Sequence, residues 1–307
     1  MNRSTMRALT LAGATALALG TTLAPAVAMP TVERGTVCVE PSGAAARGAG
    51  AQHQGADHRD VSATEQRAIE RQTAAALARK GDRLADGATV PVYVHVMRDD
   101  TGQLGDVTDR QIRDQIAVLN ETFSGGESST ASDSGFRFEL ADVQRYDNTT
   151  WHYDRASAKY RSETRRGGAD ALNMWLVDFD YLGIATFPWD YSKQGRIDGI
   201  RVHYDSLPGG GIANYNLGET ATHEAGHWFG LYHTFQGGCT ETNDEVSDTP
   251  AQSAPTRGCP EGSDTCGLPG LDPIHNYMDY SYDSCYTEFS GGQSTRMAEM
   301  RTAYRAS

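Results

Sequence analysis

Three histidines and one glutamate between positions 223 and 233 have the residue types and the spacing that zinc chemistry requires. His223 and His227 are four residues apart, so on a helix their imidazoles lie one turn apart on the same face. Glu224 follows about 100° around the helix, where its carboxylate can reach a water on the metal without being a ligand. Gly230 can adopt a positive φ and end the helix, so that His233 approaches the metal from another direction. Three neutral histidine ligands leave one coordination position open, which is typical of a catalytic zinc site.

The same residues match the pattern H-E-x-x-H-x-x-G-x-x-H at every position, which is the zinc signature of the metzincin metalloproteases. Two residues downstream fit the same interpretation. Met278 is placed for the tight turn that supports such a site from below. Tyr280, two residues later, can direct its phenol at the substrate oxygen and stabilise the developing oxyanion. The alternatives are an amphipathic helix with ordinary polar histidines, followed by a methionine and a tyrosine that only fill the core.

The first 28 residues have the composition of a secretory signal peptide. Arg3 and Arg7 precede an apolar run at residues 8–23, and Ala26-Val27-Ala28 then forms a cleavage site of the A-x-A type. A transmembrane anchor is the alternative, but the run is short and rich in small residues. We therefore expect a secreted, extracellular protein in which disulfides can form. The net charge of −13 over 307 residues argues against nucleic acid or an anionic membrane surface as a partner.

Residues 29–88 are predicted to form a pro-segment that is largely irregular and contains one helix at residues 64–84. Few large apolar residues are present there, so this stretch cannot bury enough surface to fold alone. Cys38 is separated from the other four cysteines, and a thiolate is a good fourth ligand for zinc. We expect Cys38 to block the metal in a latent precursor, with an unpaired or intermolecular thiol as the alternative. The catalytic domain then comprises residues 89–307.

The start of that domain is predicted to be an α/β arrangement. The dense β-branched run at residues 90–97 indicates a buried strand, and further strands are expected at residues 136–140, 172–179 and 197–204. Thr108 opens a helix with Gln111 as its capping-box partner. His95 and His203 lie on strands and are interpreted as structural.

An edge strand is predicted at residues 182–189, because Pro188 cannot donate a hydrogen bond to a neighbouring strand. Such an edge beside a cleft has free N–H and C=O groups that can pair with an extended peptide. We therefore expect Gly183, Ile184, Ala185 and Thr186 to bind substrate. The alternative is a plain edge strand whose aromatic neighbours pack into the core.

The zinc helix and the tract after it need different means of support. Asn216 is the expected N-cap of the helix, with Glu219 at position N3, and the face with Ala221, Ala225 and Trp228 should pack on the sheet. Beyond His233 the chain has little periodicity, and four cysteines can form two disulfides with three possible pairings. An acidic stretch there can hold calcium or can simply be solvated; it contains Asp244, Glu245 and Asp248.

Taken together, these residues resemble the pappalysin family of metzincins, most closely its compact secreted bacterial members. The resemblance extends over residues 90–304 and rests on the zinc motif, on Gly183 to Trp189, on Asp248-Thr249-Pro250, on Asn276 to Tyr280 and on the cysteines. It implies a twisted mixed sheet with the active-site helix in an upper subdomain, above an irregular lower subdomain. It also implies the disulfides Cys239–Cys266 and Cys259–Cys285, calcium near Asp248 and Thr249, and a zinc-blocking cysteine in the pro-segment.

The resulting hypothesis is a secreted zinc endopeptidase, made as a zymogen and monomeric, that cleaves extended peptides. Zinc activates a water, Glu224 acts as general base, and Tyr280 helps to hold the oxyanion. A binding protein on a degenerate protease scaffold is less consistent with the intact Glu224 and histidine set. A zinc hydrolase acting on amides or lactones is the other alternative, and the edge strand favours peptide over it.

Overall fold

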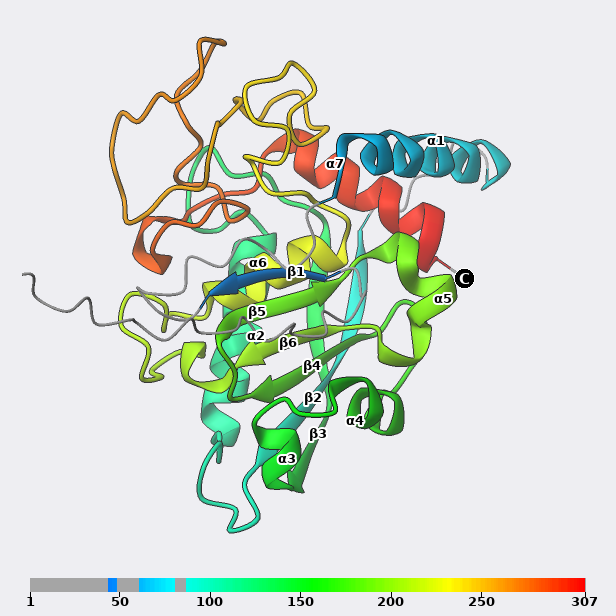
Figure 1. Ribbon diagram of the computed structural model, residues 1–307, viewed down its shortest axis with the longest axis vertical. Helices are drawn as coiled ribbons and strands as arrows, with labels where there is room; N and C mark the ends of the chain where they lie inside the picture. Colours follow the sequence, from blue (N-terminus) through cyan, green and yellow to red (C-terminus); the bar gives the residue numbers. More distant parts are fainter. Residues whose placement is uncertain (1–43, 49–60, 81–86, 307) are drawn as a thin grey trace, which may run out of the picture. The chain divides into compact units, whose positions relative to one another are not determined.

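A mixed β-sheet positions the candidate site in the computed structural model, which describes residues 44–48, 61–80 and 87–306 (Figure 1). The described residues belong to one structural unit, from Ser42 to Ser307. The predicted signal peptide, Cys38 and the end of the helix expected at 64–84 lie outside the described residues. No helix within the described ranges is long and apolar enough to cross a membrane.

The strand order of the sheet is β1-β5-β6-β4-β2-β3. The pairs β2/β3, β2/β4 and β4/β6 are parallel, whereas β5 is antiparallel to β6 and β1 is antiparallel to β5. The predicted strands are therefore present. The run that leads to Pro188 is not an edge in this structure, because β1 pairs along the outer side of β5. The strands are β1 (Ala44–Gly48), β2 (Ala88–Arg98), β3 (Phe136–Asp147), β4 (Leu172–Val177), β5 (Tyr181–Thr186) and β6 (Ile200–His203).

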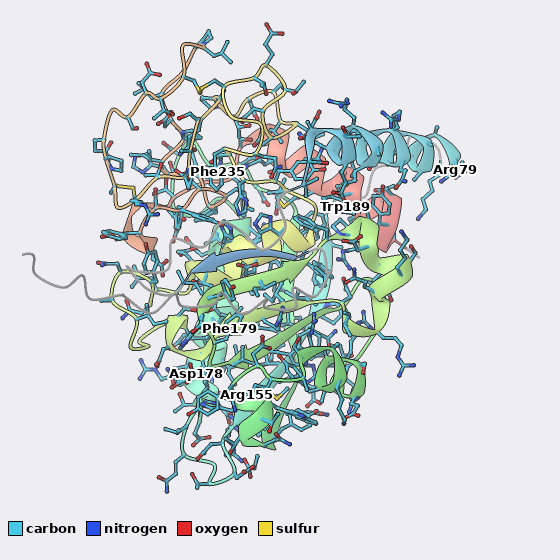
Figure 2. All side chains as sticks on the ribbon, viewed as in Figure 1. Arg79, Arg155, Asp178, Phe179, Trp189 and Phe235 are labelled. Atoms are coloured by element: carbon cyan, nitrogen blue, oxygen red, sulfur yellow. A yellow bond between two sulfur atoms is a disulfide. The ribbon has the colours of Figure 1, made fainter. Side chains whose placement is uncertain are left out.

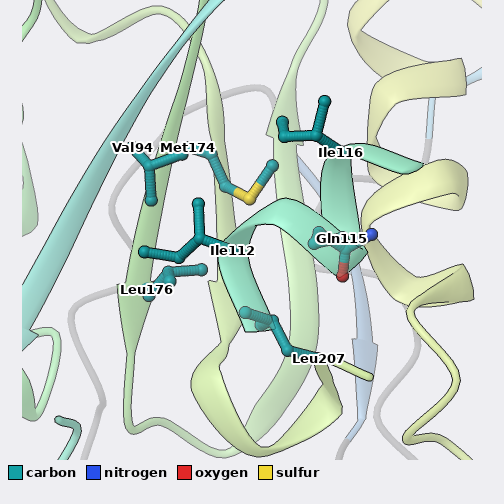
Figure 3. Close-up of a pocket in the computed structure, with 7 residues that line it drawn as sticks. All are labelled: Val94, Ile112, Gln115, Ile116, Met174, Leu176 and Leu207. Carbon is teal, nitrogen blue, oxygen red and sulfur yellow. The ribbon is translucent and has the colours of Figure 1, made fainter. Parts of the chain in front are cut away.

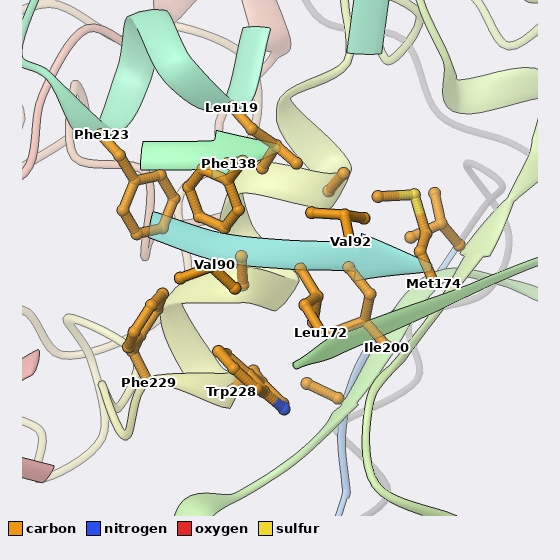
Figure 4. Close-up of a cluster of buried hydrophobic side chains, with 14 of the residues drawn as sticks. Val90, Val92, Leu119, Phe123, Phe138, Leu172, Met174, Ile200, Trp228 and Phe229 are labelled. Atoms are coloured by element: carbon orange, nitrogen blue, oxygen red, sulfur yellow. The ribbon is translucent and has the colours of Figure 1, made fainter. Parts of the chain in front are cut away.

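Both faces of the central strands are buried, which explains their nearly continuous apolar sequences. Successive side chains alternate between the faces, so Met174 of β4 contributes to one core cluster and Trp175 to another. The larger cluster lies between the sheet and the helices α2 (Asp109–Phe123) and α6 (Glu219–Trp228). Figure 4 shows Val90 and Val92 of β2 between Phe138 and Leu119 on one side and Trp228 on the other.

Short helices cover the opposite face of the sheet, where Tyr160 and Trp175 belong to the smaller cluster. The remaining helices are α1 (Ala63–Lys80), α3 (Thr149–His152), α4 (Ser157–Thr164), α5 (Tyr191–Gln194) and α7 (Gly291–Met300), which continues as a π-helical turn at Arg301–Arg305. Figure 1 shows α1 and α7 side by side at one end of the unit.

The capping box predicted at Thr108 and Gln111 is confirmed at the start of α2. The prediction for α6 was wrong, because α6 begins after Gly218 (φ 102°) and not at Asn216. The Gly218 carbonyl accepts a hydrogen bond from Gln115 of α2 at 2.9 Å. The Asn216 side chain instead donates to the carbonyl of Gly210 at 2.8 Å. A contact with a distant helix therefore fixes where the zinc helix starts.

Gln115 also borders a small apolar hollow between α2 and the sheet (Figure 3). The hollow has no room for the centre of a water molecule, so it is a packing feature of the core and not a substrate site. Its lining residues are Val94, Ile112, Gln115, Ile116, Met174, Leu176 and Leu207.

His95 is a structural histidine, as expected from its place on a strand. It is fully buried, stacks on Trp175 with ring centroids 5.3 Å apart, and has its Nε2 3.0 Å from Oδ1 of Asn173. Burial lowers the pKa of His95 to about 4, against a small opposing effect from Asn173. The imidazole is therefore neutral in the folded protein at neutral pH.

This depressed pKa predicts a loss of stability in mild acid. Below about pH 6.5 His95 becomes protonated in the unfolded chain but stays neutral in the folded protein. The free energy of unfolding should therefore fall between about pH 6.5 and 4. The contribution of this residue is on the order of 3 kcal/mol. Urea unfolding at several pH values should show a shallower decline for His95→Gln than for the wild type. Equal slopes for both proteins would contradict the assignment.

The irregular lower subdomain predicted after the zinc helix is confirmed. Between α6 and α7 the chain contains one short 3-10 turn at Asp283–Cys285 and two isolated bridges, but no strand or α-helix. Two disulfides join distant parts of this tract, and they are the pairs that the resemblance implies, Cys239–Cys266 and Cys259–Cys285. Cross-links of this kind compensate for the lack of regular structure.

Candidate metal centre

Three imidazole nitrogens converge at the end of α6. The Nε2 atoms of His223, His227 and His233 lie 2.9 to 3.2 Å from one another, and all three side chains are buried. A tetrahedral zinc ion with Zn–N bonds of about 2.0–2.1 Å needs nitrogens about 3.3 Å apart, close to this spacing. These three residues also form a group that can hold a metal ion by the positions of their ligand atoms.

The hydrogen bonds of two of these histidines orient their Nε2 atoms as a metal site needs. Nδ1 of His223 lies 2.6 Å from the carbonyl oxygen of Tyr277, and Nδ1 of His227 lies 2.8 Å from that of Leu231. Carbonyl oxygens only accept, so both Nδ1 atoms carry the hydrogen and both Nε2 atoms present lone pairs. Burial, and next the neighbouring His233, lower the pKa of His227 well below its usual value. Lone pairs this close repel unless a metal ion lies between them, so the residues fit zinc.

Gly230 ends the zinc helix in the way its position in the motif predicts. Its φ is 96°, and its N–H donates to the carbonyl of His227 while the N–H of Leu231 donates to that of Gly226. This pair of bonds is the Schellman motif that closes many helices. A Cβ at Gly230 would lie 2.6 Å from Cγ of Met300, so a larger residue does not fit. The turn directs the chain toward His233.

Met278 packs directly against the zinc helix. Its sulfur would be 2.4 Å from a Cβ at Gly226, so the helix and the methionine approach as closely as a glycine allows. Asn276 fixes the turn by accepting the N–H of Met278 at 3.0 Å, and its side-chain amide exchanges two hydrogen bonds with Gln293 of α7. The methionine turn and α7 therefore form one support for the site.

Glu224 lies directly under β5. Its side chain is buried, and a Cβ at Gly183 would lie 2.4 Å from both Cγ and Oε1 of Glu224. The glutamate is next to the histidines in the sequence and adjoins the strand expected to bind substrate. The helix thus presents metal ligands and a carboxylate to the same edge of the sheet.

Aromatic rings enclose the third ligand. Phe235 stacks on His233 with centroids 4.7 Å apart, and Tyr280 packs nearly perpendicular to the same imidazole with centroids 5.0 Å apart. Tyr280 also lies 5.7 Å from His223, and it is only half buried. The sequence prediction included Tyr280 but missed Phe235, although its place two residues after the motif was a usable signal.

The sequence of this chain is similar to those of known metalloproteases. The family model of the M43 peptidases, described as pregnancy-associated plasma protein-A, matches residues 181–302. An extracellular metalloprotease of Colletotrichum graminicola is 45% identical over 225 residues, which cover 71% of this chain and 78% of that protein. An extracellular metalloprotease of Neurospora crassa is 44% identical over 240 residues, which cover 76% of this chain and 81% of that protein. The chain belongs to the M43 peptidase family. It is an extracellular zinc metalloprotease.

Solved structures of M43-like fold agree with this assignment. Mature mirolysin of Tannerella forsythia, in complex with a cleaved peptide, is 28% identical with a TM-score of 0.62 and covers 72% of this chain and 97% of its own. A promirolysin mutant from the same organism is 28% identical with a TM-score of 0.66, and the match covers 78% of this chain and 88% of the promirolysin chain. The metzincin-type fold predicted from the sequence is therefore confirmed, and this M43 protease acts on peptides.

The four residues predicted to bind substrate differ in their surroundings. Gly183 and Ala185 contribute to the backbone ladder, and Ile184 packs with Phe179 and Tyr181. Thr186 turns inward, where its hydroxyl donates to Asp198 at 2.8 Å. Its side chain therefore has a structural role, and its backbone N–H donates to the carbonyl of Gly199 at 3.1 Å.

Asp198 connects three parts of the M43 protease, and no pattern in the sequence pointed to this role. The carboxylate is fully buried and accepts from Thr186 of β5, from the Trp228 indole of α6 at 3.0 Å, and from Arg305 through two bonds of 2.9 and 3.0 Å. Arg305 also donates to the carbonyl of Trp228 and lies 3.8 Å over its ring. The strand β5 and the zinc helix are thus both attached to one buried ion pair.

The residues predicted to bind calcium make other contacts. The carboxylate of Asp248 accepts from the Ser290 hydroxyl at 2.7 Å and from the Gly292 N–H at 2.8 Å, so it caps α7. The hydroxyl of Thr249 donates to Oδ1 of Asp244 at 2.6 Å. Asp244 is itself buried, and among the described residues its Oδ2 has no hydrogen-bond partner. Burial raises the pKa of Asp244 to about 7.

A methyl group at Gly183 should disturb the carboxylate beneath it. Gly183→Ala places Cβ within 2.4 Å of Glu224 Cγ, so the glutamate must move, and we expect kcat on a peptide to fall by about 10-fold or more. Gly267→Ala is the matched control, because a Cβ at Gly267 meets nothing within 4 Å. Steady-state kinetics on both variants test this. Equal kcat values would show that Glu224 tolerates the displacement.

Proposed function

We propose that Glu224 is the general base and acid of peptide hydrolysis and that Tyr280 stabilises the oxyanion. His223, His227 and His233 would hold zinc, which polarises the attacking water and the substrate carbonyl when bound. Glu224 accepts the proton of that water and passes it to the leaving amine. Tyr280, beside two of the ligands, donates its phenolic hydrogen to the carbonyl oxygen as negative charge develops.

The observation that carries the proposal is the position of Glu224 under Gly183 of β5. An extended substrate that takes the place of β1 along β5 has its backbone next to this carboxylate. Strand pairing reads the backbone of a peptide, which an ester or lactone lacks. The geometry thus favours a peptidase over a hydrolase of small amides or lactones.

A substrate library tests this function. The activated protein should cut peptides at internal bonds, lose the activity in chelator and recover it with zinc. Ester analogues that carry the same side chains as these peptides but lack their backbone N–H donors should be cleaved much more slowly than the peptides. Faster turnover of isolated esters or lactones than of extended peptides would overturn the peptidase assignment.

Latency of the precursor forms the second part of the proposal. We assign it to two elements of the pro-segment, Cys38 as a zinc ligand and β1 as a cover for the substrate edge. In support, β1 pairs with β5 from Ala44 opposite Thr186 to Gly48 opposite Tyr181, along the same backbone groups that a substrate would use. Cys38 lies six residues before β1, within reach of the same cleft. The precursor of Cys38→Ser still carries β1 on β5, so it should cleave peptide only slowly before processing, whereas the wild-type precursor should show no cleavage.

A structural calcium ion is the third part, as an acidic stretch of this kind suggests. We place it at Asp244, whose buried Oδ2 can supply a carboxylate ligand, near the predicted ligands Asp248 and Thr249. Calcium should then raise the melting temperature of the wild type but not of Asp244→Asn. An equal rise in both proteins would exclude this position.

A further inference from the structure

The helix α1, which the sequence places in the pro-segment, packs against the catalytic domain through a buried apolar cluster. Ile69 of α1 and Val61 just before it are almost fully buried, together with Trp189, Tyr232 and Met300. Figure 2 labels Trp189. By contrast, β1 of the same predicted segment meets the domain by strand pairing with β5. The helix α1 thus contributes to a buried apolar core, whereas β1 is attached to the domain by strand pairing.

Polar contacts attach α1 to both subdomains. Gln66 donates to the carbonyl of Asn243 and to Glu245, both at 3.1 Å, and Gln236 donates to the carbonyl of Val61 at 2.7 Å. Lys80, at the other end of α1, donates to the carbonyl of Ala306 at 2.8 Å. Removal of α1 would leave several of these partners exposed or unsatisfied.

One contact of α1 leads to the end of the zinc helix. Glu70 accepts two hydrogen bonds from Arg296 of α7, at 2.7 and 3.1 Å. The remaining Nε of Arg296 donates to the carbonyl of Gly230 at 3.0 Å. The guanidinium also lies 4.8 Å from the ring centroid of Tyr232 and is almost fully buried. A buried arginine needs its counter-ion, so Glu70 holds Arg296 in place.

Gly230 is the residue whose left-handed conformation directs His233 to the metal. Its neighbour Leu231 accepts the hydrogen bond that fixes the tautomer of His227. Arg296 holds the carbonyl between them, so it supports the turn that carries the second and third histidines. Partners beyond the first ring of ligands orient metal-binding histidines and affect how tightly the metal is held.

We infer that α1 remains part of the active protease, with Glu70 as a positioning residue that acts through Arg296 on the zinc-binding turn. Activation then cuts the chain before Val61 and releases β1, whereas the sequence had placed the boundary at residues 88–89. This inference rests on the proposed zinc site and on the latency assigned to the pro-segment.

The boundary is tested on the secreted protein after activation. Intact mass under native conditions and N-terminal sequencing should show that the active species begins between residues 49 and 61, so that it contains α1 but has lost β1. A fully active species that begins after Lys80, with no α1 peptide in its native mass, would overturn the inference.

The positioning role is tested by zinc release to a chromophoric chelator, a measurement that does not depend on peptide hydrolysis. Glu70→Gln should release zinc about 10-fold faster than the wild type, the lower end of the effect expected for residues behind metal ligands. Glu139→Gln, the same substitution at an exposed site on β3, should release it at the wild-type rate. An unchanged rate for Glu70→Gln would contradict the role.

A double variant separates positioning from stability. Glu70→Leu with Arg296→Met removes both buried charges, so the melting temperature should return toward that of the wild type. Zinc release should stay fast, because the bond to the Gly230 carbonyl is still missing. Recovery of slow zinc release in the double variant would mean that the ion pair only stabilises the fold.

Discussion

Glu224→Gln is expected to keep its zinc and to lose peptide hydrolysis by a factor of about 10² to 10⁴, the range that general acid–base catalysis contributes. Glutamine fills the same space under Gly183 but cannot accept the proton of the attacking water. The three histidines are unchanged, so metal analysis should still find one zinc per chain. Peptide turnover and zinc content are to be measured on the same preparation.

Glu139→Gln serves as the control for this variant, because it makes the same chemical change at an exposed position. Loss of zinc from Glu224→Gln would mean that the glutamate supports the metal site. Retention of wild-type turnover would remove Glu224 from the mechanism.

Asp198→Ala should lower the free energy of unfolding by about 3–5 kcal/mol, because it leaves the fully buried Arg305 without its counter-ion. The same change also leaves the Thr186 hydroxyl and the Trp228 indole without their acceptor. Urea unfolding gives the value directly. Because β5 and the zinc helix each lose a hydrogen bond to this carboxylate, kcat should fall as well.

Asp106→Ala provides the matched comparison. Asp106 pairs with Arg98 at 3.1 Å, but its side chain is 52% exposed, so this change should cost less than about 1 kcal/mol. A similar small loss for both variants would show that the buried pair contributes no more than a surface pair.

The zinc site was predictable because its ligands are local in the sequence. His223, His227 and Glu224 are placed by the period of one helix, and Gly230 and His233 by the turn that ends it. The capping box of α2 was readable for the same reason, since Thr108 and Gln111 contact each other within one turn. Short-range geometry leaves little freedom in such motifs.

The features that the sequence did not reveal depend on distant contacts. Asn216 and Gly218 are both plausible starts for the zinc helix, and Gln115, 103 residues earlier than Gly218, decides between them. Asp198 and Arg305 are 107 residues apart. From the sequence alone, each is expected to be a charged side chain exposed to solvent. The disulfide pairing was open for a related reason, since four cysteines allow three arrangements and only the family resemblance favoured one.

The two arginines that hold the end of α6 have a consequence for the order in which the protein is made. Arg296 and Arg305 donate to the carbonyls of Gly230 and Trp228, yet both are synthesised long after the histidines. A growing chain that has reached residue 290 already contains every metal ligand, but the end of its zinc helix still lacks these donors. The metal site is thus expected to reach its final geometry only when the last helix has been added.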